Sequence, residues 1–530
     1  MPKKRLSRDE SLFSIDKKAI FCYNYFDFII KEIIMKNLFS GKTLLKRVLP
    51  LLLALLLCTG CEFPDIKQLF GQSETSETSE TSTNDPNSQP QEEQVQKLNG
   101  ISIEEYAIVY SDAEPDYTLR AAEYIKSEIK TRTGVELALN EDDQPVGAHE
   151  IVVGNTNRQI SEDLDAKTEN VQFAILANES GIAMEGDYFI IAAAAYFFVE
   201  TYVPSQYFNS VIPKETKVHD PIQKKAKNFI FLIGDGMGFN QTLLFDQYDV
   251  ATEGDLAYSD GEDIFYGYYL PYQGESRTKS ASSSVTDSAA GGTALATGFK
   301  TTNGYVGKDP DGNNLQSLTE LAAALGKATA VMSTEAAIGA TPASFSAHAM
   351  DREATSSIQH TQTTLKNKYG TIIDCGYHNK TVEGVAEIQT KITNTLNEVS
   401  KDKDGFFLMY EEAHIDKAGH SKDADATFNM IVRFNQAIGL FMEYAFYNPD
   451  TFVLITADHE TGGLKKNSSG KLAYTTTAHT SANVPVFAYG YNAKAFDDRT
   501  MENVQIPITI AYMMGQKTFG DPNFYRLMSR

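Results

Sequence analysis

The stretch Phe229-Ile230-Phe231-Leu232-Ile233-Gly234-Asp235-Gly236-Met237-Gly238 decides how the larger part of this chain folds. An uninterrupted apolar run that ends in glycines predicts a strand buried on both faces, as in parallel sheets covered by helices. Further apolar runs of this kind are Ala328–Met332, Phe406–Tyr410, Thr451–Thr456 and Val484–Ala488. Helical patterns lie between them, for example Leu315–Leu325 and Thr427–Tyr447. Residues 223–530 are therefore predicted to form an α/β domain with a doubly wound, largely parallel sheet and helices on both faces.

Length and composition exclude several classes of protein. At roughly 150 residues per domain, 530 residues allow more than one domain. The net charge of −23 argues against a nucleic-acid partner, because phosphate backbones attract Lys and Arg. Only 4 Cys are present, too few for a disulfide scaffold. A hydrophobic content of 42% is typical of a globular protein.

The amino-terminal region differs in charge from the rest. Residues 1–60 contain 11 Lys and Arg against 5 Asp and Glu, which leaves −29 on the remainder. A basic segment, Lys42–Arg47, precedes the apolar run Val48–Leu57, as in secretory signals. The run is shorter than the about 20 residues that a membrane-spanning helix needs. We interpret residues 35–60 as a signal peptide that starts at Met35, and residues 1–34 as an upstream extension that is not native.

The end of this signal resembles that of a bacterial lipoprotein, with Cys61 as the lipidated residue. Cys58 stands where such signals prefer Leu, so an ordinary signal peptide or a buried helix are the alternatives. The resemblance implies that lipid on Cys61 anchors the protein to a bacterial membrane, at the cell surface or in the periplasm. Residues 61–97 include three Ser-Glu-Thr repeats and are too polar to fold alone, so we predict a tether.

Residues 98–222 are predicted to form a small α/β domain. Strand patterns at Tyr106–Tyr110 and Glu150–Val153 alternate with helical patterns at Thr118–Thr131 and Phe189–Tyr202. The order of these elements resembles the small domain ahead of the barrel in some glycoside hydrolases. The sequence leaves three roles open: a spacer, a sugar-binding module or a packing partner.

Residues that bind metals follow several predicted strands of the larger domain. Ligands of α/β sheets sit at the carboxyl ends of strands, so these positions should meet at one edge. Asp416 and His420, four apart, can face the same way from one turn of helix. An isolated Asp often caps a helix, and an isolated His is usually structural. Several Asp and His residues at one edge of the sheet instead favour a metal centre. Without Cys ligands, the donors predict two catalytic zinc sites. These donors are Asp235, Asp416, His420, Asp458, His459 and His479.

The segment Thr286–Ala294 is small and compatible with a helix, and Ser288 lies near its start. The amino terminus of a helix offers free N–H groups and the positive end of a dipole to an anion. A Ser at this place also caps helices, so the segment alone supports either a structural or a catalytic role.

Taken together, these segments resemble the alkaline phosphatase family over residues 226–490. The resemblance rests on the combination of several short motifs. They are Gly234–Gly238, Thr286–Gly298, Ala340-Thr341-Pro342-Ala343, Asp416–His420, Thr456-Ala457-Asp458-His459 and His479-Thr480. The resemblance implies hydrolysis of small phosphate monoesters with two zinc ions and one magnesium ion.

Carried over by position, the resemblance implies a role for each residue. One zinc would be held by Asp416, His420 and His479. The other would be held by Asp235, Asp458 and His459, and would also bind the Ser288 oxygen. Magnesium would be held by Thr341 and Glu411, with Asp235 as the bridge between zinc and magnesium.

The same resemblance implies that Ser288 is the nucleophile and forms a phosphoserine. Arg352 would clamp the phosphate in a fork that Lys cannot copy, and Asp287 would orient Arg352. Lys417 matches a position that reaches the phosphate in some bacterial members. Gly339 is a departure, because the family commonly has Asp or His there beside magnesium. We therefore expect an additional water and a weaker magnesium site.

The residues of the larger domain also bear on three alternative functions. A phosphodiesterase of the same superfamily generally lacks both an equivalent of Arg352 and a third metal. The sequence argues against a sulfatase, because Ser288-Ala289-Ala290 lacks the Pro and Arg that modify the sulfatase nucleophile. A surface sugar-binding protein with an inactive catalytic domain is a third alternative. The larger domain is short for the family, so insertions near dimer contacts are expected to be missing; a homodimer stays open.

Overall fold

The computed structural model describes residues 94–111, 116–164, 166–245, 264–377 and 382–528, which belong to one compact unit, Glu92–Arg530. The predicted upstream extension, signal peptide and Cys61 lie outside the described residues, as does the tether up to residue 93. Gln96 and Lys97, which we assigned to the tether, lie in strand β1 (Gln96–Leu98). Among the helices of the described ranges, none has the length and apolarity to cross a bilayer.

An eight-stranded sheet forms the centre of the larger body, in the order β13-β12-β14-β10-β15-β20-β11-β21. Its strands are β10 (Asn228–Gly234), β11 (Tyr272–Arg277), β12 (Ala328–Ser333), β13 (Ile372–Cys375), β14 (Phe406–Glu412), β15 (Thr451–Thr456), β20 (Val484–Tyr489) and β21 (Thr500–Glu502). The five strands from β13 to β15 are parallel, whereas β20 runs antiparallel to both β15 and β11. All five apolar runs are strands, which confirms the predicted largely parallel sheet.

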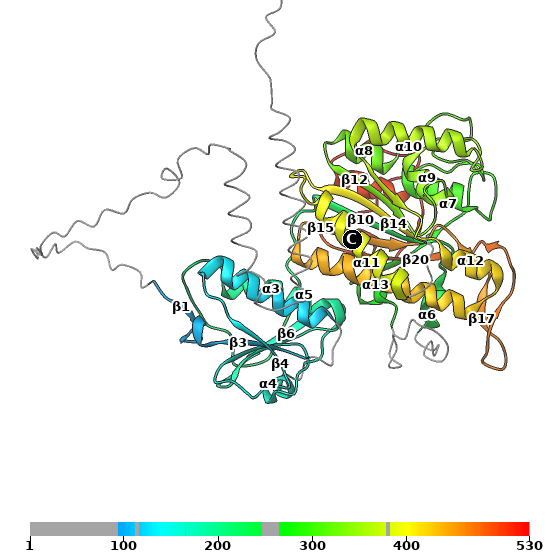
Figure 1. The fold of residues 1–530 in the computed structure, drawn as a ribbon. Coiled ribbons are helices and arrows are strands. Elements are labelled where there is room, and N and C mark those ends of the chain that lie inside the picture. The colour runs from blue at the N-terminus through cyan, green and yellow to red at the C-terminus, as the bar shows by residue number, and fades with distance from the viewer. Residues whose placement is uncertain (1–93, 112–115, 165, 246–263, 378–381, 529–530) are drawn as a thin grey trace, which may run out of the picture. The chain divides into compact units, whose positions relative to one another are not determined.

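Helices cover both faces of this sheet (Figure 1). They are α6 (Phe239–Leu243), α7 (Ser288–Thr297), α8 (Leu318–Ala324), α9 (Ala340–Ser346), α10 (Thr355–Tyr369), α11 (Val382–Val399), α12 (His414–Ser421), α13 (Ala424–Tyr447) and α14 (Gln505–Met513). Leu232 and Leu408 face the side of α11 and α13, and their neighbours Phe231 and Phe407 face the side of α7, α8, α9 and α14. Alternate side chains along each strand thus enter two different apolar cores, as the doubly wound fold requires.

Four short strands form two hairpin-like pairs beside the sheet. They are β16 (Glu460–Thr461), β17 (Leu464–Lys466), β18 (Leu472–Tyr474) and β19 (His479–Thr480). Strand β16 pairs antiparallel with β19, which places Thr461 opposite His479. The described part of the larger body also contains two 3-10 turns, η6 (Tyr266–Tyr269) and η7 (Ala493–Phe496).

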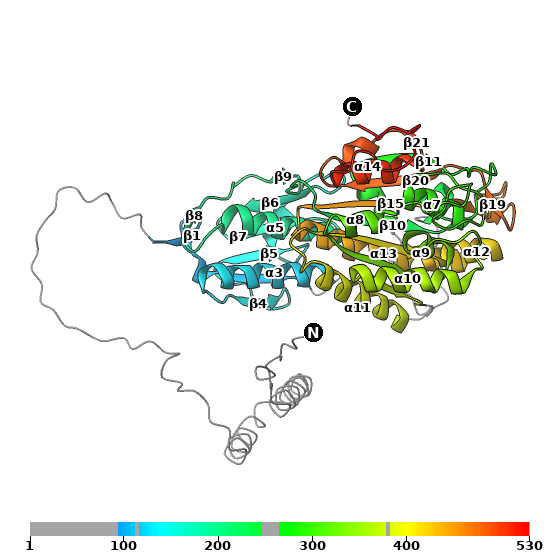
Figure 2. The ribbon, with the colours of Figure 1, turned by 90° about the horizontal axis from the view of Figure 1, so that it is seen from above.

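The smaller body contains a six-stranded sheet in the order β4-β3-β5-β7-β6-β9. Its strands are β3 (Ala107–Tyr110), β4 (Ala138–Glu141), β5 (Glu150–Val153), β6 (Phe173–Ala177), β7 (Gly181–Glu185) and β9 (Lys217–His219). Its helices are α3 (Asp116–Thr133), α4 (Gln159–Asp163) and α5 (Ile191–Tyr202), which follows the turn η3 (Tyr188–Ile190). A second sheet joins β1 to β2 (Ile101–Ser102) and β8 (Phe208–Ser210), and the turn η2 (Ile103–Glu105) follows β2. Figure 2 shows α3 and α5 beside this sheet, as we predicted for a small α/β unit.

Helix α13 contacts the smaller body. Arg120 of α3 lies 2.9 Å from Glu443 of α13, and the rings of Tyr124 and Tyr447 stack with centroids 4.3 Å apart. One apolar cluster includes buried residues of α3, α5 and α13 together. These contacts favour the packing-partner role among the three that the sequence left open. The division at residues 222 and 223 falls between β9 and β10 and stays a prediction.

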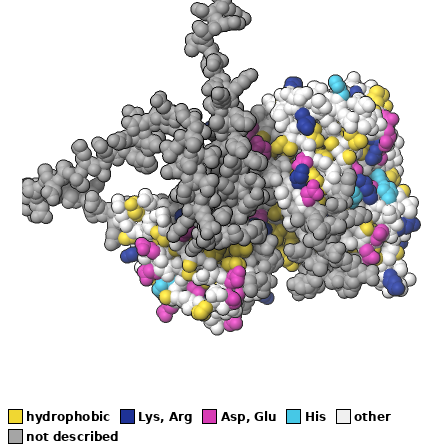
Figure 3. Space-filling model, in the orientation of Figure 1, with side chains coloured by type: hydrophobic (Ala, Val, Ile, Leu, Met, Phe, Trp, Pro, Cys, Tyr) yellow, Lys and Arg dark blue, Asp and Glu magenta, His cyan; other side chains and the backbone are white. Residues whose placement is uncertain are grey.

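The surface is consistent with the acidic composition. Figure 3 shows acidic and basic side chains interspersed on the visible described face, where no continuous basic patch is seen.

Candidate active site

The candidate ligands meet at one edge of the large sheet. Asp235 follows β10, Glu411 lies at the end of β14, and Asp458 and His459 follow β15. These strands are parallel, so their carboxyl ends lie side by side. Because β20 is antiparallel to β15, the segment before β20 reaches the same edge, and this brings His479 there.

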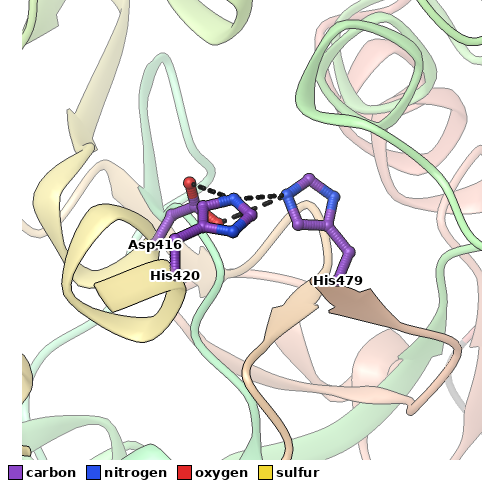
Figure 4. Close-up of side chains that lie close together, drawn as sticks. All are labelled: Asp416, His420 and His479. Atoms are coloured by element: carbon purple, nitrogen blue, oxygen red, sulfur yellow. Dashed lines mark hydrogen bonds and ion pairs between the residues drawn. The ribbon is translucent and has the colours of Figure 1, made fainter. Parts of the chain in front are cut away.

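Asp416, His420 and His479 form the first cluster (Figure 4). The first two residues lie one turn apart on α12, as the spacing predicts, and His479 reaches them from β19. His420 Nε2 lies 3.3 Å from Asp416 Oδ2, and His479 Nε2 lies 3.4 Å from Asp416 Oδ1. One nitrogen or oxygen of each residue lies within 4.8 Å of the others, so one ion could contact all three.

The orientation of the two rings shows what this cluster could bind. His420 Nδ1 lies 2.6 Å from the carbonyl oxygen of Thr477, and His479 Nδ1 lies 2.9 Å from that of Thr286. A carbonyl can only accept, so each Nδ1 carries the proton and each Nε2 presents a lone pair. The two Nε2 atoms are 3.1 Å apart. Two facing lone pairs repel each other unless a cation or a proton lies between them.

Asp235, Asp458 and His459 form the second cluster, and all three side chains are buried. His459 Nε2 lies 3.5 Å from Asp235 Oδ1 and 3.3 Å from Asp458 Oδ2. Asp416 also faces this group, because oxygens of Asp235 and Asp416 and a nitrogen of His459 lie within 4.8 Å of one another. The two clusters are therefore contiguous, with Asp416 between them.

Burial perturbs the pKa values of these groups. Burial and then the charge of Asp458 raise the pKa of Asp235, and burial raises the pKa of Asp458 to about 7. Burial also lowers the pKa of His459, and the neighbouring His479 lowers it further. Burial opposes ionisation of Asp416, but the neighbouring imidazoles of His479 and His459 lower its pKa overall. Several buried carboxylates that lie this close together repel one another, so a positive charge among them would stabilise their ionised forms.

Buried oxygens without a hydrogen-bond partner at the same edge show whether this site suits metal ions. Four buried oxygens have no hydrogen-bond partner: Asp235 Oδ1, Thr341 Oγ1, Glu411 Oε1 and Asp458 Oδ2. Buried polar atoms are almost always hydrogen-bonded, so a group of exceptions points to a missing ligand. Carboxylate and hydroxyl oxygens suit magnesium, and the nitrogen and carboxylate set suits zinc. The residues present therefore fit both metals.

Ser288 is the first residue of α7, and its Oγ lies 3.1 Å from His459 Nε2. Asp287 caps this helix, because its Oδ1 accepts a hydrogen bond from the Ala290 N–H at 2.9 Å. Its Oδ2 accepts from the Gly304 N–H at 3.0 Å and lies 3.3 Å from Arg352 Nη1. One carboxylate, that of the residue before Ser288, thus contacts both the start of α7 and Arg352.

Lys417 lies next to Asp416 on α12, and its Nζ donates to Glu335 Oε2 at 2.9 Å. The structure thus brings every predicted site residue to this edge of the sheet. The sequence reasoning overlooked three residues that contact them. Thr461 donates to Asp416 Oδ1 at 2.5 Å, Ser333 donates to Glu411, and Glu335 pairs with Lys417. Glu335 lies two residues after the end of β12, so the strand-end rule that identified the other ligands would have found it.

Comparison with known proteins agrees with this geometry. The family model for alkaline phosphatase matches residues 226–386 and 385–473. Residues 226–473 match the alkaline phosphatase family. This matched segment lies within the part of the sequence that resembles the family. It ends before His479, which the structure brings to the site from β19.

Individual relatives of this family cover part of the chain. Alkaline phosphatase 3 of Bacillus subtilis (strain 168) is 30% identical over 300 residues, which are 47% of this chain and 64% of that protein. Alkaline phosphatase 4 of the same organism is 29% identical over 238 residues, 35% of this chain and 52% of that protein. This chain therefore spans between about half and two thirds of these relatives. A solved alkaline phosphatase from the Antarctic bacterium TAB5 is 26% identical, with a TM-score of 0.46, and covers 55% of this chain and 99% of its own.

Proposed function

We propose that this chain hydrolyses phosphate monoesters through a phosphoserine on Ser288. The observation that carries the proposal is the position of Ser288 Oγ. It lies at the amino terminus of the ten-residue helix α7, 3.1 Å from His459 Nε2, where two clusters of metal ligands meet. A nucleophile beside metal ligands and a helix amino terminus is suited to an anionic phosphorus centre.

Two zinc ions and one magnesium ion are part of this proposal. Asp416, His420 and His479 would hold one zinc. Asp235, Asp458 and His459 would hold the other. Thr341 and Glu411 would hold magnesium together with Asp235. When bound, these ions neutralise the charge that develops on the attacking and leaving oxygens.

Residues of the chain supply the remaining steps. Ser288 Oγ loses its proton and attacks phosphorus, the bond from phosphorus to the ester oxygen breaks, and that oxygen takes up one proton as the alcohol leaves. A water molecule then attacks the phosphoserine, which releases inorganic phosphate and restores Ser288. Free N–H groups at the start of α7 stabilise the phosphoryl oxygens. Arg352, oriented by Asp287 at 3.3 Å, binds two of these oxygens at once, and Lys417 binds the phosphate as well.

Release of p-nitrophenol from p-nitrophenyl phosphate tests the proposal. We expect Ser288→Ala to lower kcat/KM by more than about 1,000-fold, because the covalent route is lost. Its zinc content should equal that of the parent. The matched control is Ser469→Ala, an exposed serine whose change should leave the rate unaltered. A Ser288→Ala protein as active as the parent would exclude the phosphoserine route.

The same assay with bis-p-nitrophenyl phosphate separates a monoesterase from a diesterase. The dianion of a monoester offers Arg352 and Lys417 three unesterified oxygens and two negative charges, whereas a diester offers two oxygens and one charge. We expect the monoester to react faster. A faster diester would favour the phosphodiesterase alternative, and no hydrolysis of either would favour the sugar-binding alternative.

We also propose that Cys61 is lipidated and that the protein is held at a bacterial cell surface or in the periplasm. The support is the basic, apolar and small-residue order of residues 35–61. The mass of the mature amino-terminal peptide tests this, and Cys61→Ser should move the protein from the membrane fraction to the soluble fraction. Sedimentation velocity tests for a homodimer.

A further inference from the structure

Position 339 is where the alkaline phosphatase resemblance fails, and the structure shows what fills the space. Gly339 caps α9, with φ −56° and ψ 156°. Any residue tolerates these torsions, so the backbone does not require glycine. A Cβ added at position 339 would overlap the side chain of Glu335, at its Oε1 and Cδ, and would lie 2.8 Å from its Cγ. The carboxylate of Glu335 therefore takes the place of a side chain at position 339.

Glu335 is also connected by hydrogen bonds to Lys417 and, through Ser333, to the proposed magnesium ligand Glu411. Its N–H donates to Ser333 Oγ at 3.0 Å, and the Ser333 hydroxyl donates to Glu411. Its Oε2 accepts from Lys417 Nζ at 2.9 Å. The Glu335 side chain is only 16% exposed, and it lies close enough to Glu411 and Asp235 for its charge to repel theirs. Three carboxylates that repel one another at one place are stabilised by a divalent cation.

We propose that Glu335 supplies the carboxylate that position 339 lacks, so that it helps to hold magnesium and positions Lys417 beside the phosphate. The inference rests on the proposed function for its magnesium site. Glu335 reaches this place from the end of β12, whereas a side chain at position 339 would reach it from the start of α9. The magnesium site is thus completed by a residue from a different element, and the absence of a side chain at Gly339 does not weaken it.

Magnesium binding to the zinc-loaded full chain tests this inference without turnover. We expect Glu335→Gln, which keeps the shape and removes the charge, to weaken magnesium binding by about 10- to 100-fold in equilibrium dialysis. Zinc content should not change. The matched control is Glu136→Gln, which removes the carboxylate of another Lys–Glu pair, with Lys130, far from this edge. Equal magnesium affinity in Glu335→Gln and the parent would overturn the inference.

A carboxylate moved to position 339 gives a second test. Gly339→Asp in a Glu335→Ala background removes the overlap and restores a carboxylate at this place, so magnesium affinity should recover by at least about tenfold relative to Glu335→Ala. No recovery would contradict the inference even if Glu335→Gln were poorly folded.

Lys417→Met separates magnesium binding from simple ion pairing. If Glu335 only held Lys417, this variant would lose as much magnesium affinity as Glu335→Gln, and that result overturns the inference. We expect Lys417→Met to keep most of the affinity and to weaken inhibition by inorganic phosphate. A parent that binds magnesium but releases no phosphate from any ester would refute the proposed function alone. A parent that binds no magnesium would refute the role of Glu335.

Discussion

Arg433 of α13 and Glu412 of β14 form a buried ion pair directly behind the candidate site. Arg433 Nε lies 2.6 Å from Glu412 Oε2, a second nitrogen of the same guanidinium contacts Oε1, and the side chains are 1% and 0% exposed. Glu412 Oε1 also accepts from the Thr334 hydroxyl at 3.1 Å. Since Glu411 is its neighbour on β14, this pair fixes the strand end that presents Glu411 to the site.

Arg433→Met should destabilise the protein strongly. The change leaves Glu412 buried without its counter-charge, a situation that lowers the free energy of unfolding by about 3–5 kcal/mol. Urea unfolding followed by circular dichroism measures the loss. Replacing both residues, as in Arg433→Met with Glu412→Leu, should recover most of it. The exposed pair Lys130–Glu136 is the control, and breaking it should change stability by less than about 1 kcal/mol.

The same pair predicts a dependence on pH. Burial opposes ionisation of Glu412, but the charge of Arg433 lowers the pKa of Glu412 to about 2. A lowered pKa in the folded state means that the stabilisation is complete above about pH 4.5 and is lost as the pH falls toward 2. The loss amounts to about 3 kcal/mol. Between pH 5 and pH 2, Glu412→Gln should therefore lose less stability than the parent; an equal loss in both proteins would contradict the assignment.

Gly236→Ala should disrupt the zinc ligands. Gly236 has φ +73°, and an added Cβ would lie 2.8 Å from both the Asp416 Cα and the Thr461 Oγ1. The crowding would displace Asp416, which lies between the two clusters, so we expect at least about a tenfold weaker affinity for zinc. Gly370→Ala is the matched control, because it has φ +70° but nothing within 4 Å. It carries the same backbone strain without the crowding and should keep zinc; loss of zinc in both variants would attribute the effect to strain.

Asp287→Asn should separate helix capping from the orientation of Arg352. Asparagine still caps α7, because its oxygen can accept from the Ala290 N–H, but it no longer attracts the guanidinium 3.3 Å away. We expect a melting temperature lowered only by the lost hydrogen bond from the Gly304 N–H, and inhibition by inorganic phosphate weakened about tenfold. Asp287→Ala should lose both. If phosphate inhibits Asp287→Asn as strongly as the parent, Asp287 does not orient Arg352.

The fold could be predicted because its strands are uniformly apolar, and the site because its ligands follow those strands. Asp416 and His420 could be paired from their helical spacing alone. His479 lies before β20 and reaches the ligand edge only because β20 is antiparallel to β15. An apolar run does not reveal the direction of a strand. Glu335 could not be recognised from Gly339, which marks only the position where a side chain is missing. The side chain that fills this space comes from another element, the end of β12. The pair of Glu412 and Arg433 joins residues distant in sequence, and no local pattern marks it.

Helix α13 couples detachment of the smaller body to loosening of the catalytic edge. Arg433 in the first half of α13 stabilises the strand end at the catalytic edge, and Glu443 and Tyr447 near the end of the helix contact Arg120 and Tyr124 of the smaller body. Heat that detaches the smaller body would therefore also loosen the catalytic edge. A calorimetric scan of the full chain should show a single heat-absorption peak rather than two, and proteases should not release a stable catalytic fragment.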